Sequence, residues 1–381
     1  MLAASACDLE NYLRYPDHAL DGRLAQLRAQ LGERVLILGH HYQRDEVIRF
    51  SDYQGDSLRL AQRAVEHPEA EFIIFCGVHF MAESADILRA PHQQVILPDL
   101  NAGCSMADMA DDSQVEDAWE QLQELGLAEQ FLPITYMNST AAIKAFCGRE
   151  GGTVCTSSNA PAAFRWGFEL RPRIFFLPDQ HLGRNTGVKL GLRLDEMAVW
   201  DPRQPLGGNT AAALARARVL LWKGHCSVHQ RFRPEQVDQW RARDPQIRIL
   251  VHPECSHEVV AKADLVGSTD FIIRQLRQAP AGTRWAVGTE LHLVHRLADE
   301  HPEQTVAPLD NDGCPVCSTM FRISPQHLAW VLENLTLGQV VNRIRVKDET
   351  KHWARVALNR MLALAPAASA LTEPVLAESV A

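Results

Sequence analysis

The sequence predicts an α/β protein made of three similar three-layer αβα units with short parallel sheets. The units are expected to be related by approximate threefold symmetry around a central cavity and to be followed by C-terminal helices. Three observations favour this fold. Short apolar runs rich in β-branched residues alternate with segments of helical spacing. The same succession of strands comes three times along the chain. Polar residues follow these runs directly, as they do where strand ends form a binding site.

The first strand of each predicted unit leads into two polar residues spaced two apart. The strands and their pairs are 35–39 with His40 and Tyr42, 131–135 with Tyr136 and Asn138, and 247–251 with His252 and Glu254. Alternate residues of an extended chain point to the same side, so each pair is expected to share one face.

A second and a third strand are expected in each unit. The second strands are 72–76, 152–155 and 263–267, and the third strands are 95–97, 174–177 and 285–288. Pro98-Asp99 and Pro178-Asp179 follow two of the third strands, which suggests equivalent positions in the two units. Intervening segments such as 56–65 and 141–146 have helical spacing. The alternative is a plain doubly wound sheet in which the polar residues serve as turns and caps.

The domain organisation follows from this pattern and from the length of 381 residues, which exceeds a single typical core. The expected parts are an N-terminal helical extension at 1–31, αβα units at 32–120, 121–245 and 246–325, C-terminal helices at 326–364, and a disordered Ala-rich tail at 365–381.

The composition excludes several classes of partner. The net charge is −9 and no stripe of Lys and Arg is present, which argues against nucleic acid and against an anionic membrane. No apolar stretch reaches the roughly 20 residues that span a bilayer. The N-terminus has no basic segment before an apolar one, so no secretory signal is visible. We therefore expect a cytoplasmic protein.

Nine cysteines, an odd number, favour metal ligation or reactive thiols over disulfides in a reducing compartment. Three of them, Cys104, Cys226 and Cys317, precede a serine in loops that contain Gly or Pro, and they lie 122 and 91 residues apart. No local zinc finger holds residues so distant, so they can meet only where separate units converge. Three thiolates rather than four suit a metal centre that keeps one position open for substrate.

Two alternatives remain open on the residues alone. The three cysteines can be ordinary half-buried thiols. Cys314 also competes with Cys317, because a Cys-Pro-Val-Cys pair can act as a redox dithiol or supply both thiolates to a metal.

Jointly, these motifs resemble the quinolinate synthase family of de novo NAD biosynthesis over about residues 32–362. The motifs are His40-x-Tyr42-Gln, Gly55-Asp-Ser57-Leu, Gly77-Val-His-Phe-Met-Ala-Glu83, Asn101-Ala-Gly-Cys104-Ser-Met-Ala, Tyr136-Met-Asn138-Ser, Thr156-Ser-Ser-Asn159, Gly224-His-Cys226-Ser-Val-His229, His252-Pro-Glu254-Cys, Gly267-Ser-Thr269 and Cys317-Ser-Thr-Met320. The resemblance implies an enzyme that condenses iminoaspartate with dihydroxyacetone phosphate to give quinolinate, phosphate and water.

The resemblance also implies one [4Fe-4S] cluster per chain, held by Cys104, Cys226 and Cys317, with one open iron acting as a Lewis acid. Cys317 is preferred to Cys314 because the ligand segment of the family continues as Cys-x-x-Met. Some members carry a further cysteine upstream, where this chain has Asn311-Asp-Gly313. The role of Cys314, including a regulatory disulfide, therefore stays open.

The resemblance implies catalytic roles for Glu254 as base, His252 beside it, and Tyr42 as donor or acceptor near the sugar-phosphate hydroxyls. Polar and largely neutral groups at loop and helix starts suit dianionic substrates. The implied substrate contacts are His40, Ser57, Tyr136, Asn138, Ser157, Ser268 and Thr269. His229 either lines the cavity or orients the Cys226 loop.

The expected partners are the two substrates, with a functional coupling to L-aspartate oxidase as the source of unstable iminoaspartate. Two other functions compete. One is a hydro-lyase of another small hydroxy acid, which uses the same open iron but needs no phosphate ligand. The other is an iron–sulfur redox protein or iron sensor, which would need an output surface such as a basic face.

Overall fold

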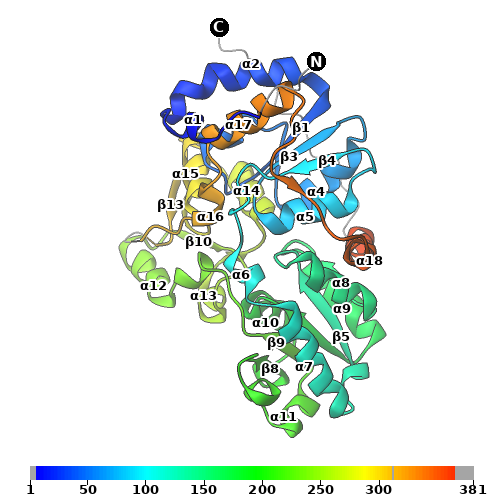
Figure 1. Cartoon of the computed structure of the whole chain (residues 1–381). Coiled ribbons are helices and arrows are strands. Elements are labelled where there is room, and N and C mark those ends of the chain that lie inside the picture. The colour runs from blue at the N-terminus through cyan, green and yellow to red at the C-terminus, as the bar shows by residue number, and fades with distance from the viewer. Residues whose placement is uncertain (1–5, 311–312, 365–381) are drawn as a thin grey trace. The chain divides into compact units, whose positions relative to one another are not determined.

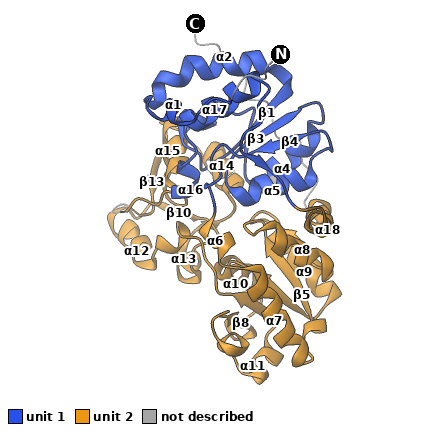
Figure 2. Ribbon diagram, in the orientation of Figure 1, with its two compact units in different colours: residues 1–103, 318–346, 365–381 blue, residues 104–317, 347–364 orange. Residues whose placement is uncertain are grey.

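The computed structural model describes residues 6–310 and 313–364, so the predicted tail at 365–381 lies outside the described part of the chain. The chain divides into two compact units (Figure 2). Unit 1 contains residues up to 103 together with 318–346, and unit 2 contains 104–317 together with 347–364.

Unit 1 is built on a five-stranded sheet with the strand order β14-β4-β3-β1-β2 (Figure 1). Its strands are β1 (Val35–His40), β2 (Tyr53–Gly55), β3 (Phe72–Cys76), β4 (Gln94–Ile96) and β14 (Arg343–Ile344). Its helices are α1 (Glu10–Leu13), α2 (Asp21–Leu31), α3 (Asp45–Ile48), α4 (Ser57–Glu66), α5 (His79–Leu88), α16 (Ser318–Phe321) and α17 (Pro325–Thr336). The strands β1 to β4 are parallel, whereas β14 joins β4 antiparallel. Every residue of β1 and β3 is buried, as expected for parallel strands covered on both faces.

Unit 2 contains two sheets whose strands are all parallel. The first, in the order β6-β5-β7-β9-β8, has β5 (Phe131–Tyr136), β6 (Thr153–Cys155), β7 (Arg173–Leu177), β8 (Met197–Trp200) and β9 (Val219–Trp222). The second, in the order β11-β10-β12-β13, has β10 (Arg248–Val251), β11 (Leu265–Val266), β12 (Arg284–Gly288) and β13 (Thr305–Pro308). The helices are α6 (Ser105–Asp108), α7 (Asp112–Glu124), α8 (Ala141–Arg149), α9 (Ala160–Leu170), α10 (Gln180–Lys189), α11 (Ala211–Arg216), α12 (Pro234–Arg243), α13 (His257–Lys262), α14 (Thr269–Gln278), α15 (Leu291–Glu300) and α18 (Asp348–Leu364).

The three sheets share one strand order. In each repeat the first strand (β1, β5 or β10) lies between the second (β2, β6 or β11) and the third (β3, β7 or β12). The strand beyond the third is β4, β9 or β13, which we call the fourth strand of the repeat. The predicted α/β class with three short parallel sheets is therefore confirmed. The threefold arrangement around a central cavity stays a prediction.

One expectation about the first repeat is wrong. The strand that follows β1 is β2, so 72–76 is the third strand and 95–97 belongs to the fourth. Pro98-Asp99 therefore follows a fourth strand, whereas Pro178-Asp179 follows the third strand β7, and the two are not equivalent. The strand β2 has only three residues, two of them partly exposed, so it gives no apolar run. The strands β8, β9 and β13 are further additions to the predicted scheme.

Both predicted C-terminal helices are confirmed as α17 and α18. Ser324 begins α17 by accepting a hydrogen bond from the main-chain N–H of His327, and Pro325 occupies the first helical position. Helix α17 packs against α2 in unit 1, whereas α18 packs against α8 and β6 in unit 2. The two helices are thus parts of different compact units.

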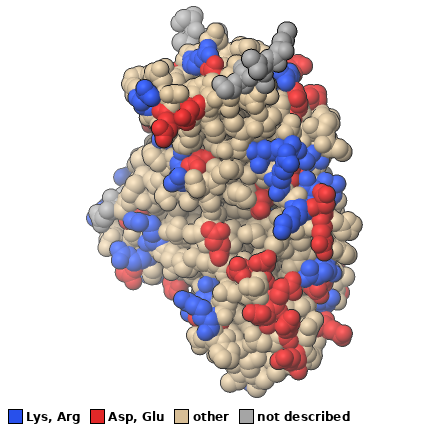
Figure 3. All heavy atoms as spheres, in the orientation of Figure 1, with Lys and Arg blue, Asp and Glu red and all other residues tan. Residues whose placement is uncertain are grey.

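The surface carries charges of both signs. On the face drawn in Figure 3, acidic and basic side chains both occur, separated by wide areas that carry neither. Within 6–310 and 313–364, no helix is both long enough and apolar enough to cross a bilayer.

Gly148 allows the close approach of α18 to α8. A Cβ atom at this position would lie 2.0 Å from the carbonyl oxygen of Trp353. We expect Gly148→Ala to displace α18 and to lower the free energy of unfolding by about 1–3 kcal/mol, as measured by urea denaturation. Gly22→Ala is the control, because a Cβ at Gly22 in α2 would meet nothing within 4 Å. That change should stabilise the protein by about 0.5–1 kcal/mol. Unchanged stability of Gly148→Ala would contradict the expected clash.

Candidate functional site

The candidate residues occupy equivalent positions in the three repeats. The polar pairs lie at or just beyond the ends of the first strands, and the hydroxyl residues Ser57, Ser157, Ser268 and Thr269 follow the second strands. The cysteines Cys104, Cys226 and Cys317 follow the fourth strands. Parallel strands end at a common edge of their sheet, and ligands bind beyond that edge in open α/β sheets. Each repeat therefore directs an acid–base or polar pair, a hydroxyl group and a thiol to the same edge.

In unit 1, the structure brings His40, Tyr42 and Ser57 to one edge of the sheet. His40 is buried at the end of β1, where it lies in register with Gly55 at the end of β2. Its Nδ1 atom accepts a hydrogen bond from the main-chain N–H of Tyr42 at 3.2 Å, and the two rings lie 4.8 Å apart. Ser57 is the first residue of α4, directly after the capping residue Asp56.

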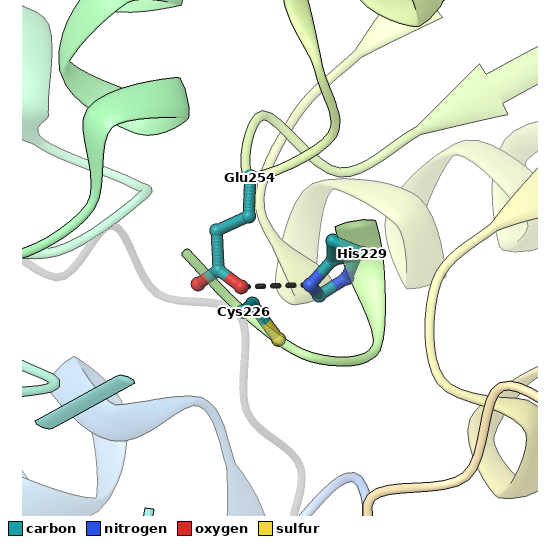
Figure 4. Close-up of side chains that lie close together, drawn as sticks. All are labelled: Cys226, His229 and Glu254. Atoms are coloured by element: carbon teal, nitrogen blue, oxygen red, sulfur yellow. Dashed lines mark ion pairs between the residues drawn. The ribbon is translucent and has the colours of Figure 1, made fainter. Parts of the chain in front are cut away.

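In unit 2, the site centres on the buried carboxylate of Glu254 (Figure 4). Its Oε1 atom accepts a hydrogen bond from the Tyr136 hydroxyl at 2.6 Å. Its Oε2 atom lies 2.7 Å from Nδ1 of His229. Tyr136 ends β5 and Glu254 follows β10, so this contact joins the ends of two different sheets.

The electrostatics keep Glu254 ionised. Burial alone would raise the pKa of Glu254, but the neighbouring His229 and His252, with hydrogen bonds from His229 and Tyr136, bring its pKa below the ordinary value. Burial lowers the pKa of His252 to about 3, despite an opposing effect from Glu254. The Nδ1 atom of His252 accepts from the main-chain N–H of Glu254 at 3.3 Å, which agrees with a neutral ring. A carboxylate base thus lies next to a neutral imidazole.

His229 comes from the segment that follows Cys226, and it is almost fully buried. Its Nε2 atom lies 3.1 Å from the hydroxyl of Thr289, and its ring stacks on His252 at 4.5 Å. Together with the contact to Glu254, this geometry agrees with either role considered for His229, because the residue both faces the carboxylate and fixes the Cys226 loop.

The remaining predicted substrate contacts in unit 2 lie at turns and helix starts. Asn138 is partly buried, and its Oδ1 atom is buried without a hydrogen-bond partner. Ser157 lies in the turn after β6, Ser268 caps α14, and Thr269 is the first residue of that helix. Among the predicted substrate contacts in the described part of unit 2, Tyr136 is the one with a hydrogen bond to Glu254.

Two supporting residues escaped the sequence reasoning. Asn185 of α10 donates its side-chain amide to the carbonyl oxygens of Pro253 and Cys255, both at 2.9 Å, and so holds the loop that carries Glu254. Thr289 follows β12 and contacts His229. A polar residue inside a helical pattern, or a threonine after a strand, gives no signal of its own.

The three candidate ligand cysteines, all in unit 2, lie close enough to influence one another. Burial, with a smaller contribution from Cys317, raises the pKa of Cys104 to about 12. The pKa of Cys226 lies well above its ordinary value. Burial is the largest cause, and the charges of Glu254, Cys104 and Cys317 act in the same direction. Thiols in such surroundings become thiolates only when a cation compensates their charge. This donor set therefore fits a metal centre.

A second group, Cys226, His229 and Glu254, has ligand atoms within 4.8 Å of one another. Two ligands of a tetrahedral metal ion would lie roughly 3.3 Å apart, from metal–ligand distances near 2.05 Å. The 2.7 Å between His229 and Glu254 is instead a hydrogen-bond distance. We therefore assign these two side chains to a close ion-pair contact and leave the thiols as the metal donors.

The fold and the site define an α/β enzyme that joins a buried carboxylate–histidine pair to soft thiolate donors. The sequence model of a family described as quinolinate synthetase A protein matches residues 23–363. Curated relatives named quinolinate synthase are similar to this chain over most of their length. They are from Acidobacterium capsulatum (61% identical, covering 94% of this chain and 96% of the relative), Nocardioides sp. (59%, 91% and 90%) and Geobacillus thermodenitrificans (55%, 93% and 96%). The chain belongs to the quinolinate synthase family and is an enzyme of that type, which confirms the resemblance found in its motifs.

The Tyr136 hydroxyl is expected to matter for catalysis through Glu254. Tyr136→Phe removes a hydrogen bond to a buried carboxylate, worth about 1.5–3 kcal/mol, so turnover should fall roughly 10- to 150-fold. Steady-state kinetics at one pH measure this loss, with circular dichroism to verify folding. Tyr15→Phe is the control, because Tyr15 is exposed on unit 1. Equal activity of Tyr136→Phe and Tyr15→Phe would remove Tyr136 from the active site.

Proposed function

We propose that this chain condenses iminoaspartate with dihydroxyacetone phosphate to give quinolinate, phosphate and water in de novo NAD biosynthesis. The observation that carries the proposal is the ionised Glu254, hydrogen-bonded to Tyr136 and in ion-pair contact with His229, in the same unit as three mutually interacting thiols. The name quinolinate synthase, borne by the relatives, supports the product.

Cys104, Cys226 and Cys317 would hold one [4Fe-4S] cluster per chain and leave one iron without a protein ligand. The support for this assignment is the convergence of three thiols, too few to fill the four ligand positions of a closed structural site. When bound, the cluster supplies a Lewis acid that polarises a carbonyl or hydroxyl oxygen of the substrate.

Glu254 would act as the general base of the condensation. The lowered pKa of this buried carboxyl keeps it ionised at neutral pH, and an ionised carboxylate is the form that can take a proton from a substrate carbon or hydroxyl group. His252, kept neutral by burial, can hydrogen-bond a substrate group at the same place. Tyr42 in unit 1 is proposed as the donor or acceptor for the sugar-phosphate hydroxyls.

The dianionic substrates would be bound largely by neutral donors. Ser268 and Thr269 lie at the start of α14, where main-chain N–H groups and the helix dipole favour an anion. Asn138 has a buried amide oxygen that a substrate hydroxyl or amino group can use. His40, Ser57, Tyr136 and Ser157 complete the proposed contacts. Supply of iminoaspartate by L-aspartate oxidase and a cytoplasmic location belong to the same proposal.

Replacement of the proposed ligands should remove the iron. After anaerobic purification, Cys104→Ser, Cys226→Ser and Cys317→Ser should each lose most of the brown absorbance and most of the iron per chain, because a serine oxygen is a poor replacement for a thiolate. Cys314→Ser is the matched control, since Cys314 is exposed, and it should keep its iron. Full iron and full activity in all three ligand variants would refute the assignment.

Glu254→Gln should separate chemistry from metal binding. The change keeps the side-chain shape but removes the base, so we expect an unchanged iron content and a rate at least ~100-fold lower. The assay measures phosphate release from dihydroxyacetone phosphate with a chemical source of iminoaspartate. Glu258→Gln on the exposed side of α13 should retain the wild-type rate. A wild-type rate for Glu254→Gln would remove Glu254 from the mechanism, whereas dehydration of a hydroxy acid without phosphate release would favour the hydro-lyase.

A further inference from the structure

The helix after the third strand makes the same main-chain hydrogen bond in all three repeats. Its first residue donates its N–H to a carbonyl oxygen located two residues before a cysteine. The three bonds run from His79 to Ala102 (2.8 Å), from Gln180 to Gly224 (3.0 Å) and from Leu291 to Pro315 (3.1 Å). The cysteines that follow these acceptors are Cys104, Cys226 and Cys317. The recurrence links each cysteine loop to the neighbouring strand end of its own repeat.

The residue that caps this helix differs between the repeats. It is Val78 before α5, Asp179 before α10 and Glu290 before α15. Val78 makes no side-chain cap, whereas Asp179 accepts hydrogen bonds with Oδ1 from the first turn of its helix. In the third repeat, the capping side chain also reaches the cysteine itself.

Glu290 is fully buried, and both of its oxygens are engaged. Its Oε2 atom caps α15 by accepting from the main-chain N–H groups of His292 (2.9 Å) and Leu293 (3.3 Å). Its Oε1 atom accepts from the main-chain N–H of Cys317 at 3.3 Å and lies 2.8 Å from Nδ1 of His292. A buried carboxylate is stable only when its oxygens are hydrogen-bonded, so Glu290 and the Cys317 segment stabilise each other.

We propose that Glu290 is a positioning residue, which fixes the main chain at Cys317 and thereby directs its thiol toward the metal centre. The proposal rests on the cluster proposed above. Groups that orient the ligands of a metal in this way matter for its affinity. Their mutation typically lowers metal affinity by about 10- to 100-fold.

Capping alone does not explain a glutamate at this position. Asp179 caps α10 with a single oxygen, so the shorter side chain suffices for a helix start. The additional methylene group of Glu290 places its second carboxylate oxygen within reach of Cys317. Shortening this side chain should therefore keep the cap and lose the contact with the cysteine.

Glu290→Asp tests the proposal in the anaerobically purified full-length chain. We expect a circular dichroism spectrum and a melting temperature close to those of the wild type. Amide hydrogen exchange in peptides that contain Cys317 should become roughly tenfold faster, because one protecting hydrogen bond is lost. Iron loss to a chelator should become roughly 10-fold faster or more. Peptides that contain Cys226 should exchange as in the wild type.

The matched control is Asp111→Asn, which alters the carboxylate cap of α7, where the side chain accepts a hydrogen bond from the main-chain N–H of Ser113. It should change neither the exchange at Cys317 nor the loss of iron. If Glu290→Asp folds poorly, the same two measurements, amide exchange at Cys317 and iron loss, are made on Glu290→Gln instead. This variant keeps the length of the side chain.

Wild-type exchange at Cys317 in Glu290→Asp would overturn the proposal and leave Glu290 as a helix cap. Faster exchange without faster iron loss would also overturn it, because the contact would then not serve the metal. If the wild-type chain contains no iron, the proposed cluster is contradicted independently of the role of Glu290. Exchange at Cys317 then still decides whether Glu290 holds this segment.

Discussion

The pairing of the buried Glu254 carboxylate with His229 and Tyr136 is the interaction on which the site depends. A carboxylate so deeply buried would take up a proton if it had no partners, and it would then be useless as a base at neutral pH. Tyr136 ends β5 and His229 lies in the segment that follows β9, whereas Glu254 follows β10 in the other sheet of unit 2. The interaction that sets the charge of Glu254 therefore also joins the two sheets. Loss of one partner is expected to affect both chemistry and stability.

The strand order distributes the chemistry of the site in a regular way. Within each repeat, the first strand carries an acid–base or polar pair, the second a hydroxyl group, and the fourth a cysteine. The helix after the third strand supplies the N–H group that holds the cysteine loop. This regularity follows from geometry, since parallel strands gather their carboxyl ends at one edge and each neighbour contributes one type of group there.

The sequence predicted those parts of the fold that depend on local patterns. The continuous apolar runs of β1, β5 and β10 and the helical spacing of α17 and α18 are properties of neighbouring residues. The short, half-exposed β2 gave no such pattern, and the shared Pro-Asp sequence misled because it carries no information about strand order.

Within the site, the motifs placed Tyr136 and Glu254 at strand ends, but the contact between them joins residues 118 positions apart, and only the packing of two sheets determines it. Asn185, Thr289 and Glu290 are likewise identified by what they contact and not by their neighbours in the sequence. The cysteine ligands and the remaining substrate contacts stay predictions that the recurring geometry supports.

The three cysteine loops differ in length, and the way each is held differs accordingly. Cys226 comes soon after β9 ends at Trp222, and the close approach of Gly224 to the carbonyl oxygen of Pro178 (a Cβ would lie 2.3 Å from it) confines this short loop. Cys317 comes well after β13 ends at Pro308, and the contact with Glu290 holds its main chain. A metal centre gains affinity when its ligands are already in place, so a carboxylate that holds the main chain at Cys317 is expected to favour metal binding.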